Sequence, residues 1–289
     1  PKLDDQDGNS VPDYVDSALV YLEIAWDAAV KLGYSTPKSD MGLGGSDAVD
    51  VYIQELSNQR YYGYTSPDNS MLPIGSSYMV IDNDFKEDVY PSKGLDALKV
   101  TTAHEFFHVI HYSYYGGYDA VWWMEHSAVW MEDYVWDTIN DYVHYVGDFL
   151  NDRETSLDSS ESYMYGASLF AFMLGKKHGP ETIRTVWDAF KDRRSGRIEL
   201  FNTIVPGMLS KAIGDLGVWS YFTGERANPQ VFFKDSALMR TMVKADTTLS
   251  SIPAIDSLSC RRHTFKYVEI APKGGLTTAD SLQFIFSDR

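Results

Sequence analysis

The chain has 289 residues and carries 41 acidic and 25 basic side chains, which gives a formal net charge of −16. This length suits one large domain, or a catalytic domain with a smaller appendage. The balance of 44% hydrophobic and 23% charged residues excludes a disordered chain. The negative charge argues against DNA or RNA as a partner, because phosphate binding needs a basic surface.

Covalent and membrane constraints are few. Cys260 is the only cysteine, so no disulfide can form within the chain and stability must come from core packing or bound metal. No stretch reaches the roughly 20 apolar residues that a membrane span needs. The chain begins at Pro1 without Met or a signal peptide, as expected of a processed export product or of a trimmed chain. Nothing in the sequence indicates an oligomeric state.

The first third of the chain predicts one helix and two short strands. Apolar residues recur at helical spacing from residue 14 to 32, and Gly33 follows where a helix should stop. Residues 49–53 alternate as a strand does. Residues 61–75 are rich in Tyr, Gly, Ser and Pro and indicate a loop, and residues 78–81 form a second short strand.

The rest of the chain predicts helices followed by a small β element. Amphipathic segments cover residues 95–112, 121–135, 163–177 and 181–193. Near Leu238 the pattern changes, and two strand-like runs at 265–270 and 282–286 flank a Gly274-Gly275 turn. We therefore expect an α+β fold, with a main domain at residues 1–235 and a β-rich element at residues 236–289.

The segment His104-Glu105-Phe106-Phe107-His108 is an H-E-x-x-H motif inside a predicted helix. Residues four apart lie one turn apart on the same helix face, so both imidazoles can reach one ion. Zinc suits neutral imidazole and lowers the pKa of bound water to about 7. Glu105 projects beside the two histidines, where its carboxylate can accept a proton from that water. The motif therefore predicts His104 and His108 as zinc ligands and Glu105 as the general base.

A catalytic zinc needs a third protein ligand. His111 lies on nearly the same helix face, but three histidines on one straight helix cannot converge on one tetrahedral ion, so His111 is expected to be a supporting or core residue. A helical hairpin can bring Glu125 back over the first helix, which makes Glu125 the expected ligand. His126 remains a rival ligand, and Glu132 a weaker one.

The second helix resembles that of the gluzincins, the metallopeptidases with H-E-x-x-H and a downstream Glu. Their second helix often reads W-x-x-E-G-x-A-x-Y-x-E, and the matching positions here are Trp122, Glu125, Ala128, Trp130 and Glu132, with His126 in place of Gly. The resemblance implies a zincin-like domain with a small N-terminal sheet, the H-E-x-x-H helix and a helical C-terminal lobe. In zincins an edge strand before the zinc helix pairs with substrate, so residues 78–81 are expected to line the cleft.

A further segment, Tyr163-Met164-Tyr165-Gly166-Ala167, resembles the Y-x-x-G-A segment of gluzincin aminopeptidases. The resemblance implies that Tyr163 donates a hydrogen bond to the oxyanion of the tetrahedral intermediate, with Tyr165 as the alternative. The aminopeptidase segment G-x-M-E-N is absent from the sequence, which favours an endopeptidase. The layout of residues 1–235, which opens with a V-P-D-Y loop, resembles a group of secreted bacterial metalloproteinases.

The N-terminal loop places oxygen-bearing side chains at alternating positions, a spacing that wraps ligands around Ca²⁺. The expected ligands are Asp5, Asp7, Asn9, Val11, Asp13 and Asp16. The bound ion would tie down the terminus, and it favours the extracellular space, where calcium is plentiful. A second ion at Asp82-Asn83-Asp84, or at Asp47 and Asp50, stays open.

Together these patterns predict a secreted, zinc-dependent endopeptidase that is stabilised by calcium and acts on protein or peptide substrates. Two other interpretations remain open. One is a zinc hydrolase that acts on another acyl group, because the motif specifies activated water and not the bond attacked. The other is a surface-binding protein in which the metals are structural. Glu105 favours an enzyme, since a structural site needs no base.

Overall fold

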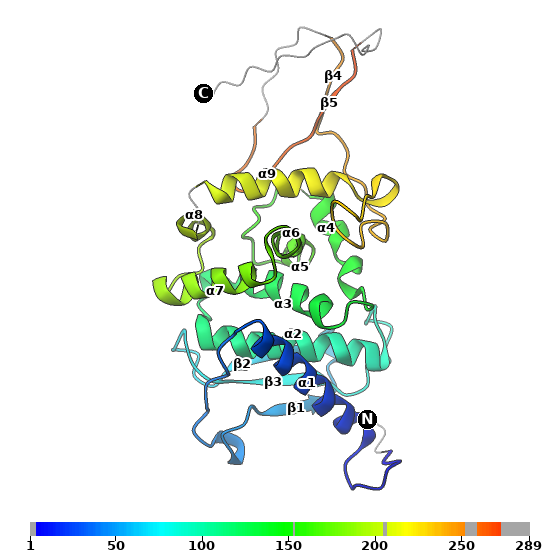
Figure 1. The fold of residues 1–289 in the computed structure, drawn as a ribbon. Helices are drawn as coiled ribbons and strands as arrows, with labels where there is room; N and C mark the ends of the chain where they lie inside the picture. Colours follow the sequence, from blue (N-terminus) through cyan, green and yellow to red (C-terminus); the bar gives the residue numbers. More distant parts are fainter. Residues whose placement is uncertain (1–3, 153, 205–206, 252–258, 273–289) are drawn as a thin grey trace.

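The computed structural model describes residues 4–152, 154–204, 207–251 and 259–272. Its described part is α+β, about half helical, with a small mixed sheet near the N-terminus (Figure 1). The helices are α1 Asp13–Lys31, α2 Gly94–Tyr114, α3 Val121–Val135, α4 Val146–Asn151, α5 Tyr163–Ala167, α6 Leu169–His178, α7 Glu181–Arg193, α8 Phe201–Ile204 and α9 Met208–Tyr221. The strands are β1 Val51–Gln54, β2 Gly63–Pro67, β3 Ser77–Asp82, β4 Thr247–Leu249 and β5 Val268–Ile270.

The first sheet has the order β1-β3-β2, with β3 parallel to β1 and antiparallel to β2. The central position of β3 corrects the prediction that the strand at residues 78–81 is an edge strand. The expected loop at 61–75 contains β2, which was missed because Gly63 and Pro67 are poor strand formers. Among the described strands, β1 and β2 are therefore the two edges of this sheet.

The hydrogen bonds to β3 show which residues of β1 and β2 direct their backbone groups toward β3 and which direct them away from it. The Asp82 N–H donates to the Tyr62 carbonyl, and the Met79 N–H donates to the Asp50 carbonyl. Even-numbered residues of β1 and β2 therefore bond to β3, and odd-numbered residues direct their backbone groups away from it. At β2 the outward residues include Gly63 and Thr65, and at β1 they are Val51 and Ile53.

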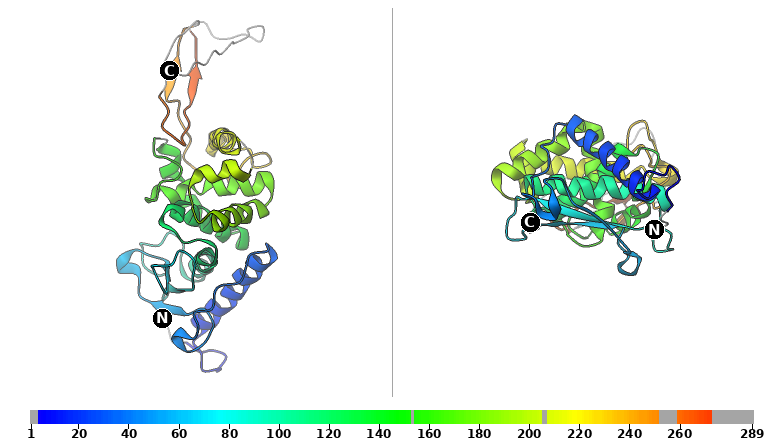
Figure 2. Two further views of the ribbon diagram at one scale, coloured as in Figure 1. Left: turned by 90° about the vertical axis from the view of Figure 1, so that its left-hand side faces the viewer. Right: turned by 90° about the horizontal axis from the view of Figure 1, so that it is seen from below.

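Helix α2 packs against one face of this sheet through β3 and β2, and α1 packs against α2 (Figures 1 and 2). On α1, the buried residues Ala18, Ala25 and Ala29 share one face and let the helix approach α2 closely. Helix α2 is buried along most of its length, from Ala97 to Tyr114. This burial on all sides gives the H-E-x-x-H segment a rigid position at the centre of the molecule.

Helices α3, α6, α7 and α9 are stacked beyond α2, on the side away from the sheet (Figure 1). Large aromatic rings such as Trp123, Trp187 and Phe170 are fully buried between them. None of the described helices combines the length and the apolar character that crossing a membrane requires.

The last described segments form a small β element at the end of the molecule opposite the sheet (Figures 1 and 2). Strand β4 pairs with β5 in parallel, with Thr247 opposite Val268. Met239 and Val243 precede this pair and belong to the main core. The predicted strand at 282–286 and the Gly274-Gly275 turn lie outside the described residues. The domain boundary at residue 235 stays a prediction.

Candidate metal centre

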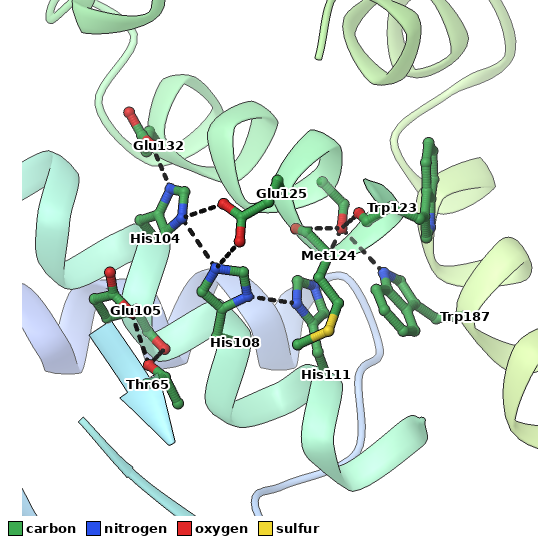
Figure 3. Close-up of polar contacts among 11 residues, drawn as sticks. Thr65, His104, Glu105, His108, His111, Trp123, Met124, Glu125, Glu132 and Trp187 are labelled. Atoms are coloured by element: carbon green, nitrogen blue, oxygen red, sulfur yellow. Dashed lines mark hydrogen bonds and ion pairs between the residues drawn. The ribbon is translucent and has the colours of Figure 1, made fainter. Parts of the chain in front are cut away.

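Three side chains converge where α2 packs against α3 (Figure 3). The Nε2 atoms of His104 and His108 lie 3.0 Å apart. The Glu125 carboxylate lies 3.2 Å from His104 Nε2 and 3.4 Å from His108 Nε2. A tetrahedral zinc with Zn–N and Zn–O distances near 2.0–2.1 Å separates its ligand atoms by roughly 3.3 Å. The ligand set expected from the sequence is thus brought together at spacings that fit a zinc ion.

Glu132 orients the first of these histidines. Its carboxylate lies 2.6 Å from His104 Nδ1, so that ring nitrogen carries a proton and donates it to the carboxylate. The other nitrogen, Nε2, then presents a lone pair to His108 and Glu125. Glu132 is therefore placed as a partner of a ligand, the arrangement common behind metal-bound histidines, and not as a ligand itself.

A chain of buried hydrogen bonds orients the second histidine (Figure 3). His108 Nδ1 lies 3.1 Å from His111 Nδ1, and His111 Nε2 lies 3.1 Å from Ser127 Oγ. The Trp187 indole N–H donates to the same Ser127 oxygen over 3.1 Å. The Ser127 hydroxyl donates to the Trp123 carbonyl at 2.7 Å. This chain links α2, α3 and α7.

The protons of this chain can be assigned from its two ends. Since the single Ser127 proton goes to the Trp123 carbonyl, Ser127 accepts from His111 Nε2–H. Burial lowers the pKa of His111 well below its usual value, so its ring is neutral and its Nδ1 is an acceptor. His108 Nδ1 therefore donates to it, which leaves a lone pair on His108 Nε2.

Three hydrogen-bond acceptors thus face one another, namely Nε2 of His104, Nε2 of His108 and the carboxylate of Glu125. Their mutual repulsion is relieved only by a cation between them, a metal ion or a proton. Burial by itself would raise the pKa of Glu125, but His108 and His104 outweigh it and lower that pKa. Burial would lower the pKa of His104, yet its bonds to Glu125 and Glu132 raise it well above its usual value. The donor set fits zinc, which prefers neutral imidazole and carboxylate.

Glu105 points away from the convergent atoms toward β2 (Figure 3). Its carboxylate accepts a 2.8 Å hydrogen bond from the Thr65 hydroxyl, and a Cβ on Gly63 would lie 2.9 Å from Glu105 Cγ. Gly63 therefore allows β2 to approach α2 closely. Burial raises the pKa of Glu105, while His104 and His108 lower it in part. A carboxylate with a raised pKa is a suitable general base.

The two tyrosines of α5 lie in different surroundings. Tyr163 is buried with its ring 5.6 Å from that of Phe149, and both residues line a small internal cavity with Phe265. Tyr163 thus lies in the core, and the oxyanion role that the resemblance implies for it stays a prediction. Glu125, followed by burial and Glu105, raises the pKa of Tyr165. The alternative candidate is Tyr165. Its hydroxyl lies close enough to Glu125 and Glu105 for their negative charges to raise its pKa.

His126 does not join the metal centre. It is fully buried and packs edge-on against Trp122, with ring centroids 5.2 Å apart. Neither ring nitrogen has a hydrogen-bond partner among the described residues, and burial lowers the pKa of His126 to about 3. Adjacent helical residues point about 100° apart, which carries His126 to another face of α3 from Glu125.

The N-terminal acidic loop gathers part of the predicted calcium ligands. Carboxylate oxygens of Asp5, Asp7 and Asp13 lie within 4.8 Å of one another. The Asn9 amide bridges Asp7 and Asp16 through bonds of 3.1 and 3.0 Å. The loop is exposed, and its compact folding keeps these oxygens available to one ion. Calcium at this loop, including the Val11 carbonyl as a ligand, stays a prediction.

The acidic residues at the end of β3 have a structural explanation. The buried Asp82 carboxylate accepts hydrogen bonds from the Leu56 and Phe85 N–H groups and from the Tyr90 hydroxyl. Asp84 pairs with Lys86 at 2.5 Å. Asp82 therefore fixes the turn after the strand. Oxygens of Asp82, Asp84 and Glu87 also lie within 4.8 Å of one another, and a second ion at this turn stays a prediction.

This chain matches no protein-family model, no curated protein and no solved structure. Sequence reasoning missed Thr65, Ser127 and Trp187 as partners of the site. Thr65 lies in a segment that was expected to be a loop, and Trp187 lies 60 residues from Ser127. Contacts between residues so far apart in the sequence cannot be predicted from a local sequence pattern.

Proposed function

We propose that the protein is a zinc-dependent endopeptidase. The observation that carries this proposal is the convergence of three lone pairs from His104, His108 and Glu125, with Glu105 outside the ligand set but within electrostatic range of His104 and His108. A purely structural metal site needs ligands but has no use for a buried carboxylate next to them. The gluzincin resemblance of α2 and α3 supports the same assignment.

Zinc held by these side chains would supply a Lewis acid that polarises a carbonyl and acidifies water. Glu105 then accepts the proton of the attacking water and passes it to the leaving amine, which takes the electrons of the broken C–N bond. Thr65 holds the Glu105 carboxylate through its hydroxyl. The Tyr165 hydroxyl is proposed as a donor to the oxyanion of the tetrahedral intermediate.

The edge of β2 supports a peptide as the substrate. The outward backbone groups of Gly63 and Thr65 lie on the strand whose Thr65 side chain touches Glu105. An extended peptide that pairs with this edge would lie along the zinc centre, with its main chain held by hydrogen bonds. A non-peptide acyl substrate would have no use for such an edge, so we rank a zinc hydrolase of another class second.

We further propose that Ca²⁺ binds the loop at Asp5, Asp7 and Asp13 as a structural ion, and that the protein acts outside the cell. The exposed, clustered carboxylates support the first statement. The second follows from it, because weak calcium sites fill at the millimolar concentrations found outside cells.

The test is Glu105→Gln, with exposed Glu181→Gln as the matched control. We expect Glu105→Gln to bind one zinc per chain like the wild type and to lose about 10²–10⁴-fold in kcat/KM on a peptide library. Glu181→Gln should keep both properties. Unchanged turnover of Glu105→Gln would refute its role, and chelator-resistant cleavage by the wild type would refute zinc dependence.

A further inference from the structure

A second concave surface lies away from the metal centre. A groove of about 570 Å³ runs between α1 and the segment at residues 37–49, and its floor is formed by Val51, Met79 and Phe106. Its α1 wall includes Leu19 and Trp26, which are 52% and 36% exposed. A volume of several hundred Å³ lined by apolar side chains is typical of a binding site.

The groove is bordered by the edge of β1 that faces away from β3, with which no other described strand pairs. The Met79 N–H bonds to the Asp50 carbonyl, so the N–H and C=O groups of Val51 and Ile53 point outward, away from β3. The Val51 side chain lines the groove. A strand added to β1 would therefore hydrogen-bond to these groups and direct alternate side chains into the apolar groove.

The charge of the groove restricts its occupant. Glu23, Asp27 and Asp47 line it together with one basic residue, Lys38. Two acidic side chains project from α1, next to exposed Leu19 and Trp26. A second copy of this chain, with a net charge of −16, would be repelled, whereas a basic partner would be attracted.

We propose that this groove binds an extended polypeptide segment that adds to β1 as a fourth strand of the sheet and carries both apolar and basic side chains at its groove-facing positions, which are every second residue. The apolar side chains pack on the floor of the groove, and Lys or Arg side chains on the same face of the added strand meet Glu23 and Asp27 of the α1 wall. This site is separate from the β2 edge, and it does not depend on the proposed peptidase activity. It gives the protein a second surface for a polypeptide partner.

The test is fluorescence anisotropy with the labelled nine-residue peptide Val-Thr-Lys-Thr-Val-Thr-Lys-Thr-Val, whose Val and Lys side chains share one face of the strand, measured on the Glu105→Gln protein so that the probe is not cleaved. Glu23→Lys/Asp27→Lys should weaken binding by at least about 10-fold. N-methylation of alternate amides of the probe removes about two backbone hydrogen bonds, and should weaken binding by about 10- to 100-fold. The same probe with Asp in place of Lys should not bind.

Val51→Pro locates the site on the sheet. Proline removes the outward Val51 N–H without removing a bond to β3, so binding should be lost while the melting temperature stays near that of the parent protein. Exposed Glu181→Lys is the matched charge control and should leave the affinity unchanged. Equal affinity for the N-methylated and unmodified probes, or full affinity of the Glu23→Lys/Asp27→Lys protein, would overturn the proposal. If Val51→Pro fails to fold, comparing the affinities of the N-methylated and unmodified probes still tests whether the peptide binds through backbone hydrogen bonds.

Discussion

His108 and His111 face each other through their Nδ1 atoms at 3.1 Å, although both belong to the same helix. His111 stacks on Trp187 with ring centroids 4.2 Å apart and an interplanar angle of 18°. The imidazole of His111 is fully buried. This neutral ring fixes the tautomer of His108 and so directs the His108 Nε2 lone pair toward the proposed zinc ion.

Replacing His111 should therefore weaken zinc binding without removing a ligand. We expect His111→Leu to lower zinc affinity about 10–100-fold, as is common for partners of metal-bound histidines. His111→Asn, whose amide oxygen can still accept a hydrogen bond, should lose less. Competition with a fluorescent chelator measures both affinities, and circular dichroism monitors folding. Wild-type affinity in a folded His111→Leu protein would show that the hydrogen-bond chain is only structural.

Zinc binding should weaken as the pH falls, because zinc must displace a proton from His104. The carboxylates of Glu125 and Glu132 outweigh burial and raise the pKa of His104 above its usual value of about 6.5. The loss of affinity should thus begin above pH 6.5. Glu132→Gln removes one of these negative charges, so the loss of zinc affinity should begin at a lower pH. The zinc affinity of this variant should also be lower at every pH, because Glu132 no longer orients His104. Titrations with zinc from pH 5.5 to 8 would contradict this account if Glu132→Gln left the pH dependence unchanged.

Thr65 should control the acidic limit of activity. Its hydroxyl donates to Glu105 and lowers the pKa of that carboxyl, against the effect of burial. Thr65→Val should raise the pKa of Glu105, and since the base acts only when ionised, the acidic limb of kcat/KM should move to higher pH. Thr65→Ser keeps the hydroxyl and serves as the control. An unshifted limb in Thr65→Val would exclude this role for Thr65.

The two tyrosines of α5 give opposite expectations. Tyr165→Phe should lower kcat about 10²-fold with little change in zinc affinity, because an oxyanion donor acts only in the transition state. Tyr163→Phe removes a hydroxyl from a core position and should leave kcat within about 3-fold of the wild type. Steady-state kinetics on one peptide compares the two. The reverse order would support the oxyanion role that the gluzincin resemblance implies for Tyr163.

Calcium should stabilise the folded protein through the N-terminal loop. At about 100 times its Kd, calcium should add about 2.7 kcal/mol to the free energy of unfolding. Asp7→Asn should abolish this increment, and exposed Asp192→Asn on α7 should retain it. Thermal unfolding with and without calcium, at constant ionic strength, gives both values. An equal calcium effect in the two variants would place the ion elsewhere.

The strongly periodic parts of the fold were predictable from the sequence. The helices at 121–135 and 181–193 were predicted with the bounds found for α3 and α7, and α1 and α2 were predicted within two residues at each end. These segments carry long amphipathic patterns or clear stop signals. The short helices α4 and α8 and the longer α9 were not predicted.

The site was predictable to the extent that its chemistry is local. His104, Glu105 and His108 lie within one helical segment, and Glu125 follows one turn into the next helix. The position of β2 was not readable, because a strand of Gly, Tyr, Thr, Ser and Pro acquires its structure from pairing with β3 and packing on α2. The choice between Tyr163 and Tyr165 depends on the rotation of a short helix, which spacing alone does not fix.

Anomalous diffraction at the zinc absorption edge tests the central claim most directly. Crystals grown with equimolar zinc should give one strong peak about 2.0–2.2 Å from His104 Nε2, His108 Nε2 and a Glu125 oxygen. Glu105 should lie outside bonding distance of that peak. A peak that is bound by Glu105, that lies at other residues, or that is missing from this convergence would contradict the account.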